Sequence, residues 1–542
     1  MKVWKGIAIL VALVLANVLV HQFVVRWDMT DDRRYSIAAP TQELMRSLDA
    51  PLEITILLDG ELNAGFQRLQ RATQELVEEL SVYAGKGNRT GAIRYVVSSE
   101  HIPQGLEPMI IHERTHKGQT AQTTVYPYAL IQYRDKGTVV SLLRNNRGLS
   151  GEENLNLSIE NLEFAFAEAI LSLTRTEVEK IAFLEGHGEL NERDVYDISQ
   201  ALSRYYQIDR GVLGNETGVL DDYRAVIIAD PQEPFSDEDK FILDQYIMQG
   251  GRVLWLINGV RFSADYLSQS GMTPVIPLEL NLTDMLFRYG VRVNANLVQD
   301  MQCLPVPVDV SNNPEQPNWQ PMPWTYAPLL LTSEVSSITR NLMQVSATMC
   351  SSIDFVGGED GLRKDVLLAS SSASRLTSCP AEVDLSIVQD DASAYKYAYL
   401  PVAASMEGCF TSLYAHLLPP ENIVMHTSLK KQSVPTKQIV VACGSAIRNE
   451  WQQGRPLPLG YDRYTHTQFG NRDFMVNAVL YLTDDTGWMS LRQKVIALRL
   501  LNDQRARDER VTAQVISIVV PLLLLALLGV IILLVRGRKY KM

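Results

Sequence analysis

Two long apolar runs lie near the ends of this chain, and a largely polar stretch of globular character separates them. The first run covers residues 6–25 and the second covers residues 511–535. Each has about the 20 residues that a helix needs to cross a bilayer. Val24 and Val25 end the first run and Arg26 follows it, where a cleaved signal peptide would have small residues. The pattern predicts two retained membrane-spanning helices that flank the rest of the chain.

Charges beside the two runs favour termini on the cytoplasmic side. Lys2 and Lys5 precede the first run, and three basic residues lie in the tail 537–542. The inner flanks mix arginine with aspartate and glutamate. Basic residues concentrate on the cytoplasmic side of membrane helices. We therefore expect a two-pass protein of the inner membrane, with both termini cytoplasmic and the bulk of the chain periplasmic.

Residues 51–175 predict an α/β domain. Its elements, from apolar periodicity and turn residues, are strand 51–58, helix 66–84, strand 93–97, hairpin strands 125–133 and 138–143, and helix 157–174. Asp135-Lys136-Gly137 is the expected hairpin turn. This order of elements resembles a thioredoxin-like domain. Because the domain contains no cysteine, thiol redox chemistry is excluded there.

Residues 176–488 predict a second, larger α/β domain. Its strands are short, continuous apolar runs, as expected for a parallel sheet that helices cover on both faces. The predicted strands are 181–184, 225–229, 253–257, 366–369 and 439–443. Ser236 and Asp239 mark the start of an apolar helix over 241–248, and Gly250-Gly251 ends it. The alternation of strand and helix predicts a doubly wound sheet of flavodoxin type.

A proline-rich insertion at about 301–328 interrupts the second domain. Seven prolines lie between residues 304 and 328. Since proline lacks an amide N–H, we expect an extended surface loop there rather than a helix or a central strand. The remaining predicted segments are an N-terminal anchor (1–26), a juxtamembrane segment (27–50), a helical stalk (489–510), a C-terminal membrane helix (511–536) and a basic cytoplasmic tail (537–542).

Net charge and cysteine spacing limit the classes of function. The formal net charge of -12 argues against a nucleic-acid-binding protein, which needs a basic surface. The five cysteines form no CxxC pair, and their spacing predicts no metal site. Two states of these cysteines stay open, namely buried free thiols and one disulfide.

A zinc-protease motif occurs once, at residues 112–116, which read His-Glu-Arg-Thr-His. The two histidines bind zinc only when a helix places them on one face. Met109 to Ile111 predict an extended segment instead, and four residues along a strand separate two imidazoles by about 13 Å. We therefore expect a chance match. No G-x-S-x-G elbow and no P-loop is present, so we predict no catalytic residue, no metal and no cofactor.

The candidate contact site is the segment Glu185, Gly186, His187, Gly188 and Glu189, directly after the first strand of the second domain. Ligands of doubly wound sheets bind beyond the carboxyl ends of the strands. Glycines also let a backbone approach a ligand closely. These five residues are the predicted ligand or partner contact. The alternative is a tight turn whose glycines serve only the backbone.

Several longer segments resemble one family. They are residues 28–36, 183–189, 243–255, 286–302, 456–462, 471–485 and 491–501. Spread over nearly the whole chain, they are similar to the GldG family of ABC transporter auxiliary components linked to gliding motility. The resemblance implies a membrane-anchored accessory subunit that works with a multispanning permease of GldF type and an ATPase of GldA type. It also implies a domain like the glutamine-amidotransferase and intraflagellar-transport (GIFT) fold.

Three functions stay open at this point. The double anchor favours a noncatalytic accessory subunit of a transporter, with an envelope protein or a small-molecule substrate as a further partner and no nucleic acid. A solute-binding receptor needs a cleft between the two α/β domains, lined by groups such as His187 and Glu189. An envelope hydrolase on an amidotransferase-like sheet needs an activated nucleophile, which the sequence does not show.

Overall fold

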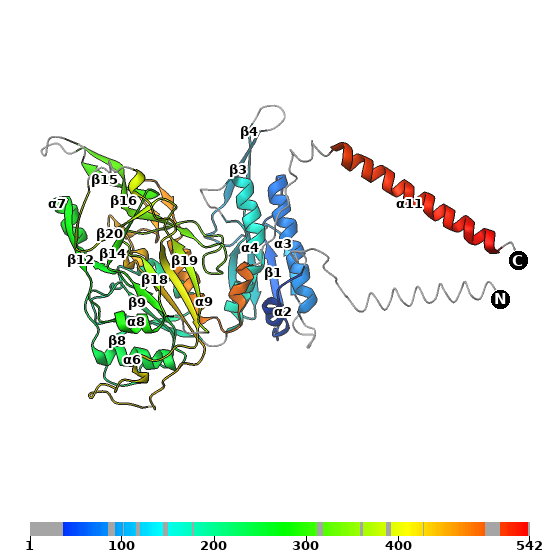
Figure 1. Cartoon of the computed structure of the whole chain (residues 1–542). Helices are drawn as coiled ribbons and strands as arrows, with labels where there is room; N and C mark the ends of the chain where they lie inside the picture. The colour runs from blue at the N-terminus through cyan, green and yellow to red at the C-terminus, as the bar shows by residue number, and fades with distance from the viewer. Residues whose placement is uncertain are drawn as a thin grey trace. The chain divides into compact units, whose positions relative to one another are not determined.

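The chain divides into two compact units, Met1–Lys494 and Val495–Met542 (Figure 1). The computed structural model describes residues 36–84, 93–100, 102–114, 120–144, 150–175, 178–309, 311, 318–357, 361–385, 392–426, 428–493 and 510–539. Within the larger unit we call residues 36–175 the N-terminal lobe and residues 178–493 the C-terminal lobe. The predicted first membrane helix at 6–25 lies outside the described residues, so the two-pass arrangement stays a prediction.

The N-terminal lobe is a four-stranded sheet in the order β2-β1-β5-β6, packed against helices. Its elements are α2 (Ala39–Arg46), β1 (Leu52–Ile56), α3 (Ala64–Tyr83), β2 (Ile93–Val97), β3 (Met109–Arg114), β4 (Thr120–Val125), β5 (Tyr128–Tyr133), β6 (Lys136–Ser141) and α4 (Gly151–Thr174). β1 and β2 are parallel, and β5 is antiparallel to both β1 and β6. The predicted order of strand, helix, strand, hairpin and helix is confirmed, with the separate hairpin β3-β4 added.

Helix α3 shows why this lobe folds as its pattern predicts. The side chain of Asn63 accepts a hydrogen bond from Phe66 N at 2.9 Å and so caps the helix. Phe66, Leu69 and Val77 lie on its buried face.

One detail differs in the hairpin of β5 and β6, where Tyr133 pairs with Lys136. The turn is therefore Arg134-Asp135, one residue earlier than expected.

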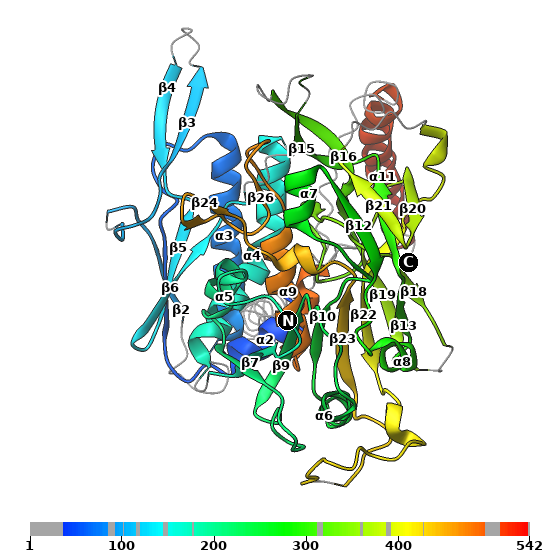
Figure 2. The same ribbon diagram turned by 90° about the vertical axis from the view of Figure 1, so that its left-hand side faces the viewer.

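The C-terminal lobe is built on a ten-stranded sheet with the order β15-β16-β19-β22-β23-β10-β9-β7-β8, and β17 pairs β16 beside this path. The strands are β7 (Lys180–Glu185), β8 (Gln207–Val212), β9 (Tyr223–Ala229), β10 (Val253–Leu256), β15 (Cys303–Asp309), β16 (Trp319–Thr332), β17 (Val345–Ser346), β19 (Arg363–Ala369), β22 (Pro401–Gly408) and β23 (Thr436–Val441). β8, β7, β9, β10 and β23 are parallel. When these five strands are numbered in chain order, they lie side by side in the order 2-1-3-4-5, as in flavodoxin-like doubly wound sheets. Figure 2 shows β9, β10, β23, β22 and β19 side by side.

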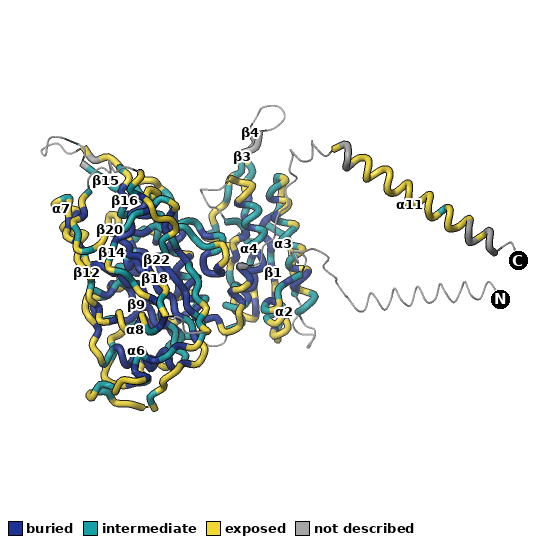
Figure 3. The backbone as a smooth tube through the Cα atoms, in the orientation of Figure 1, coloured by how far each residue is buried: buried dark blue, intermediate teal, exposed yellow. Residues whose placement is uncertain are grey.

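Helices cover both faces of this sheet, because successive strand residues point to opposite sides. Ile227 of β9 belongs to the buried cluster that contains Phe474, and its neighbour Ile228 belongs to the cluster that contains Tyr246. The helices on these two faces are α5 (Tyr196–Leu202) and α9 (Asn471–Thr483) on one, and α6 (Asp237–Met248) and α8 (Thr283–Arg288) on the other. The central strand β10 is buried throughout, and β7, β9 and β23 are mostly buried (Figure 3).

Smaller elements surround the sheet. They are β11 (Val260–Arg261), α7 (Ala264–Ser270), β12 (Met272–Pro277), β13 (Val291–Val293), β14 (Asn296–Asp300), β18 (Ile353–Phe355), β20 (Ser374–Ser378), β21 (Ala381–Asp384), β24 (Trp451–Gln452), β25 (Arg455–Pro456), β26 (Tyr461–Asp462), β27 (Thr467–Gln468), and the 3₁₀ helices η1 (Ala392–Ala394), η2 (Leu413–Ala415), η3 (Gly444–Ile447) and η4 (Trp488–Gln493). The predicted start of α6 is confirmed, since the side chain of Ser236 accepts from Asp239 N. Gly250 follows that helix with φ +103°.

The proline-rich segment contains two strands, so the expectation of a surface loop is wrong for much of it. β15 and β16 pair antiparallel, with Pro305 opposite Pro323 and Pro307 opposite Pro321. Residues two apart on a strand direct their backbone groups to the same side. All four prolines can therefore occupy the pairs that exchange no hydrogen bonds, where the missing N–H costs nothing.

The direction of β19 and the presence of β8 and β22 also differ from expectation. Residues 366–369, predicted for the parallel set, lie in β19, which is antiparallel to β22. A short apolar run does not encode its direction, so the pattern could not show this. β8 and β22 were not predicted. β8 is an edge strand that carries the polar residues Gln207, Asp209 and Arg210, whereas β22 is composed largely of small residues.

Helix α4 contributes to the cores of both lobes. Leu162 and Phe166 pack in the N-terminal core, and Phe164 and Ala167 pack in the C-terminal one. The 3₁₀ helix η4 also joins the C-terminal core through Trp488, Met489 and Leu491. The predicted stalk was to begin at residue 489, but residues 489–493 belong to this packed helix. Residues 494–509 lie outside the described part of the chain.

The smaller unit contains helix α11 (Arg510–Lys539), which covers the predicted span 511–536. The 20-residue segment Gln514–Leu533 of this helix is long and apolar enough to cross a membrane. Among the described residues it is the one helix that meets this test. Pro521 lies inside the helix without ending it.

Candidate functional site

The predicted contact segment forms a tight turn after β7. Gly186 and Gly188 have φ angles of +115° and +72°, which glycine adopts without steric cost. A Cβ atom at Gly186 would lie 3.3 Å from Val212 Cγ1, and one at Gly188 would lie 3.2 Å from Gln232 Cβ. Both glycines are therefore required by the backbone itself.

His187 lies in the centre of this turn and is only 6% exposed. Its Nδ1 atom is 3.1 Å from Glu189 Oε1, and its Nε2 atom is 3.1 Å from Asp239 Oδ2 at the start of α6. The imidazole stacks on Phe235, with ring centroids 3.7 Å apart. Its backbone N–H donates to Glu189 Oε2, and its carbonyl accepts from Gln232 N. The chain itself thus satisfies the polar atoms of His187.

The two carboxylates keep this imidazole charged. Burial lowers the pKa of His187, but hydrogen bonds to Asp239 and Glu189 outweigh burial and raise the pKa to about 9. Burial raises the pKa of Asp239, yet its hydrogen bonds to His187 and Ser236 leave the pKa below the ordinary value. A protonated imidazole has no lone pair for a metal or for base catalysis. His187 therefore joins the turn to α6 as a buried ion-pair centre.

Glu185 also has a partner inside the chain. Its Oε1 atom accepts a hydrogen bond from Arg210 Nε of β8 at 2.7 Å. The same guanidinium donates to the carbonyl of Leu190 at 2.7 Å and lies over the ring of Phe183, 5.2 Å from its centroid. Of the five predicted residues, the three with functional side chains are thus held in internal ion pairs, and the two glycines remain exposed as backbone.

The neighbouring strand ends are filled in a similar way. Asp230 follows β9, Asn258 follows β10 and Gly444 follows β23. Asp230 Oδ1 accepts from Gln232 Nε2 at 3.0 Å and from Asn258 Nδ2 at 2.8 Å. Asn258 Oδ1 in turn accepts from Gly444 N at 2.9 Å. A Cβ atom at Gly444 would lie 2.0 Å from Asp230 Oδ1. The carboxyl edge, where doubly wound sheets bind ligands, is packed with the chain's own groups.

Asp230 is the principal residue of this edge that sequence reasoning missed. Burial raises its pKa to about 6, against the smaller lowering effects of Arg448 and Gln232. Its φ of +55° is rare for a residue other than glycine. A signal was present in the sequence, because a single aspartate directly follows the apolar run 225–229 and directly precedes a proline.

Other polar residues after strands are also held by the fold. Ser371 follows β19, and its hydroxyl and amide donate to the two carboxylate oxygens of buried Asp300 at 2.5 and 2.6 Å. The hydroxyl of Ser445 donates to the carbonyl of Thr348 at 3.0 Å. All five cysteines are free thiols, and Cys443 is buried. The structure therefore favours the free-thiol alternative over a disulfide.

The zinc-protease motif lies partly on a strand. Residues 112–114 belong to β3, where His112 pairs with Gln122 of β4. The expected extended conformation before the motif is confirmed. His116 lies outside the described residues. Residues 109–114 form a strand, whereas this motif requires a helix to bind zinc.

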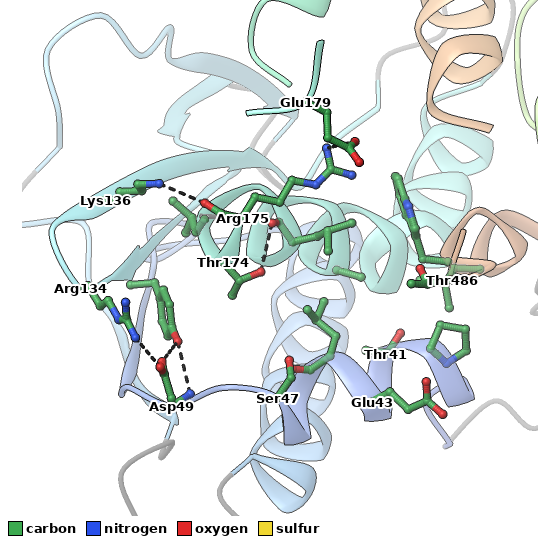
Figure 4. A pocket seen from close by; sticks show the side chains of 18 of the residues that line it. Thr41, Glu43, Ser47, Asp49, Arg134, Lys136, Thr174, Arg175, Glu179 and Thr486 are labelled. Atoms are coloured by element: carbon green, nitrogen blue, oxygen red, sulfur yellow. Dashed lines mark hydrogen bonds and ion pairs between the residues drawn. The ribbon is translucent and has the colours of Figure 1, made fainter. Parts of the chain in front are cut away.

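A groove of about 910 Å³ lies between the two lobes (Figure 4). Its walls come from α2, the β5-β6 turn, the carboxyl end of α4, and η4. Leu44, Leu171 and Trp488 line its apolar part, and charged residues border it. None of the five predicted contact residues belongs to this lining. The groove therefore differs from the receptor cleft that His187 and Glu189 were expected to line.

Sequence comparison assigns two parts of the chain. Residues 179–478 match the family described as "ABC-type uncharacterized transport system". This match covers more than half of the 542 residues and includes all five parallel strands. Residues 31–132 match a domain of unknown function, DUF7088. None of the curated proteins compared with the chain matches it.

Two solved structures are similar in part. The mmIFT52 N-terminal domain is 14% identical, and the match covers 56% of this chain and 98% of that domain, with a TM-score of 0.33. A ThuA-like protein from Parabacteroides merdae ATCC 43184 is 9% identical, with coverage of 57% and 90% and a TM-score of 0.25. At TM-scores below 0.5 neither likeness carries an argument. The family match over the parallel sheet does, and the chain belongs to the ABC-type uncharacterized transport system family.

Proposed function

We propose that this chain is a membrane-anchored, noncatalytic accessory subunit of an ABC transport system. The observation that carries the proposal is the presence, in one chain, of a folded unit of this family and the apolar helix α11. Membership of the family supports an auxiliary component of a transport system. The helix supplies a means to hold that component at the membrane where the transporter works.

The surface of α11 supports an anchor. Leu525 is 66% exposed and Leu533 is 69% exposed, and apolar side chains surround the helix between them. A helix that is apolar on all sides is stable in lipid but exposes a large unfavourable surface to water. We propose that residues 6–25 form a second span. Both termini would then be cytoplasmic, and the larger unit would be periplasmic.

The packed carboxyl edge supports the absence of catalysis. An active site on such a sheet needs polar groups that a substrate can reach. Here His187 is held between two carboxylates, and Asp230 is held by the amides of Gln232 and Asn258. We therefore propose that the turn at 185–189 contacts a partner protein through its exposed glycine backbone, and that it does not bind a small ligand.

The resemblance to the GldG family extends the proposal. The partners would be a multispanning permease of GldF type and an ATPase of GldA type, and the process served would be gliding. The element order of the N-terminal lobe supports a thioredoxin-like fold. The 2-1-3-4-5 order of the parallel strands supports a GIFT-like fold for the C-terminal lobe.

Purification from native membranes tests the proposal. The tagged full-length chain is extracted in mild detergent, and the proteins that accompany it are identified by mass spectrometry. We expect an ABC ATPase and a multispanning permease in amounts comparable to the chain. Recovery of the chain without either subunit, from membranes in which both are detected, would contradict an accessory role.

A further inference from the structure

We infer that the groove between the lobes binds an amphipathic helical segment of the transporter's membrane subunit. The inference rests on the proposed function and identifies the surface that would make the contact. The groove is lined on one side by α2 and the β5-β6 turn, and on the other by the end of α4 and by η4. Figure 4 shows the labelled polar side chains around it.

The location of the groove favours a partner near the membrane. Pro40, Thr41 and Leu44 of α2 line it, and 13 residues separate the start of α2 from the end of the predicted span 6–25. A chain of that length reaches at most ~45 Å when fully extended. Leu491 lines the opposite wall, two residues before the described part of the larger unit ends. Both chain segments that lead toward the predicted spans therefore begin at the walls of the groove.

Four of the seven charged residues that line the groove form two ion pairs with each other. Asp49 accepts a hydrogen bond from the guanidinium of Arg134, and Arg175 lies 3.8 Å from Glu179. The ammonium of Lys136 donates to the carbonyl of Arg175 at 3.2 Å. Beside these two ion pairs, Lys136 stands against Glu43 and Asp135, so the lining carries little net charge and does not select a strongly charged ligand.

The remaining lining is apolar with hydroxyl groups beside it. The apolar part includes Leu44, Leu171 and Trp488, and the hydroxyl-bearing residues are Thr41, Ser47, Tyr133, Thr174 and Thr486. This combination suits the face of an amphipathic segment, with apolar side chains in the middle and polar groups at its margins. An amphipathic helix close to a bilayer surface is a segment that a membrane subunit can provide.

The walls indicate a helix as the bound form. Peptides that bind as strands need a free strand edge, but helices and a turn form most of this lining. A helix with its side chains has a diameter of about 10 Å, so a volume near 910 Å³ corresponds to about two helical turns. The groove is thus large enough for a short helical segment and too small for a domain.

Photocrosslinking in native membranes tests the inference. A benzophenone amino acid replaces Ser47, an exposed residue at the margin of the groove. The matched control replaces Glu75, an exposed residue of α3 that does not line it. We expect a crosslink from position 47 to the multispanning permease, at least fivefold stronger than from position 75. The crosslinked peptide should map to a segment of that subunit beside a membrane span.

Filling the groove gives the second readout. Ser47→Trp should lower recovery of the permease at least fivefold, whereas Glu75→Trp should leave it unchanged, at equal melting temperatures of the two variants. Crosslinks that map to residues 494–509 of the same chain, or to a second copy of the chain, would overturn the inference. So would unchanged recovery with Ser47→Trp. If even the unsubstituted chain recovers neither subunit, the proposed function itself fails.

Discussion

The indole of Trp488 stacks on the ring of Phe164, with centroids 5.2 Å apart and planes 18° from parallel. Phe164 belongs to α4, which packs in both lobes, and Trp488 begins the last described turn before α11. The guanidinium of Arg492 lies over the same phenyl ring, 4.9 Å from its centroid, and donates to Asn477 Oδ1 at 2.6 Å. The chain segment that leads to α11 is therefore attached to α4 and α9.

Removal of the Trp488 ring should destabilise the larger unit. Trp488 is 6% exposed, and truncation of a buried aromatic ring to alanine costs about 3 kcal/mol or more. We expect Trp488→Ala to lower the urea concentration at which the full-length chain unfolds, followed by circular dichroism. Trp488→Phe should retain most of the stability because it keeps a ring against Phe164. Equal stability of the alanine variant and the parent would show that this contact does not hold the lobes.

The charged His187 should make stability fall as the pH rises. Its folded pKa of about 9 lies above its ordinary value of 6.5, so its stabilisation is complete below pH 6.5 and is lost as the pH rises through 9. The side chain is 8% exposed, and a shift of this size is worth about 3 kcal/mol. His187→Gln should therefore be less stable than the parent at pH 6.5, with the difference closing toward pH 10. Urea unfolding at both pH values measures this, and a difference independent of pH would contradict the ion-pair account.

Removal of the Asp230 carboxylate should stabilise the larger unit at neutral pH. Its folded pKa of about 6 exceeds the ordinary value of 3.8, so stability falls as the pH rises from 3.8 to 6. Asp230→Asn removes this cost and keeps Oδ1 for the amides of Gln232 and Asn258. We expect the variant to be about 3 kcal/mol more stable at pH 7.5 and close to the parent at pH 4. Loss of stability at pH 7.5 would show that the carboxylate itself is required.

Cys409 reports on which side of the membrane the larger unit lies. It is the one exposed cysteine, and Cys350 and Cys443 are buried. A maleimide that cannot cross membranes should label Cys409 once the outer membrane is opened, if the larger unit is periplasmic. Cys409→Ser should lose most of the label and serves as the control. Labelling that appears only after the inner membrane is disrupted would place the larger unit in the cytoplasm.

Local periodicity predicted the elements that are apolar on one or both faces. The stripe of Phe66, Leu69 and Val77 predicted α3, and the apolar runs before Glu185 and Asp230 predicted β7 and β9. These patterns depend only on which face a residue buries. They do not contain strand direction, which is why β19 was expected in the parallel set. The edge strand β8, with its polar residues, carries no such pattern.

The sequence located the turn at 185–189 but not the residues of the chain that hold it. The turn at 185–189 could be recognised because glycines follow a buried strand. The role of His187 in this turn depends on its contacts with Asp239, 52 residues away along the chain, and with Phe235. Likewise Gly444 lies against Asp230 only because β23 and β9 both flank β10. Contacts of this kind arise from tertiary packing and have no local signature.

Assembly in a defined membrane tests the accessory role most directly. The full-length chain, the ABC permease and the ATPase of the same cell are reconstituted together into lipid nanodiscs, and particle masses are measured by mass photometry. The account predicts particles that contain all three proteins, heavier than permease-ATPase discs by one or more units of 60.8 kDa, the mass of this chain. A chain that occupies discs of its own, whatever the concentration of the other two subunits, would contradict it.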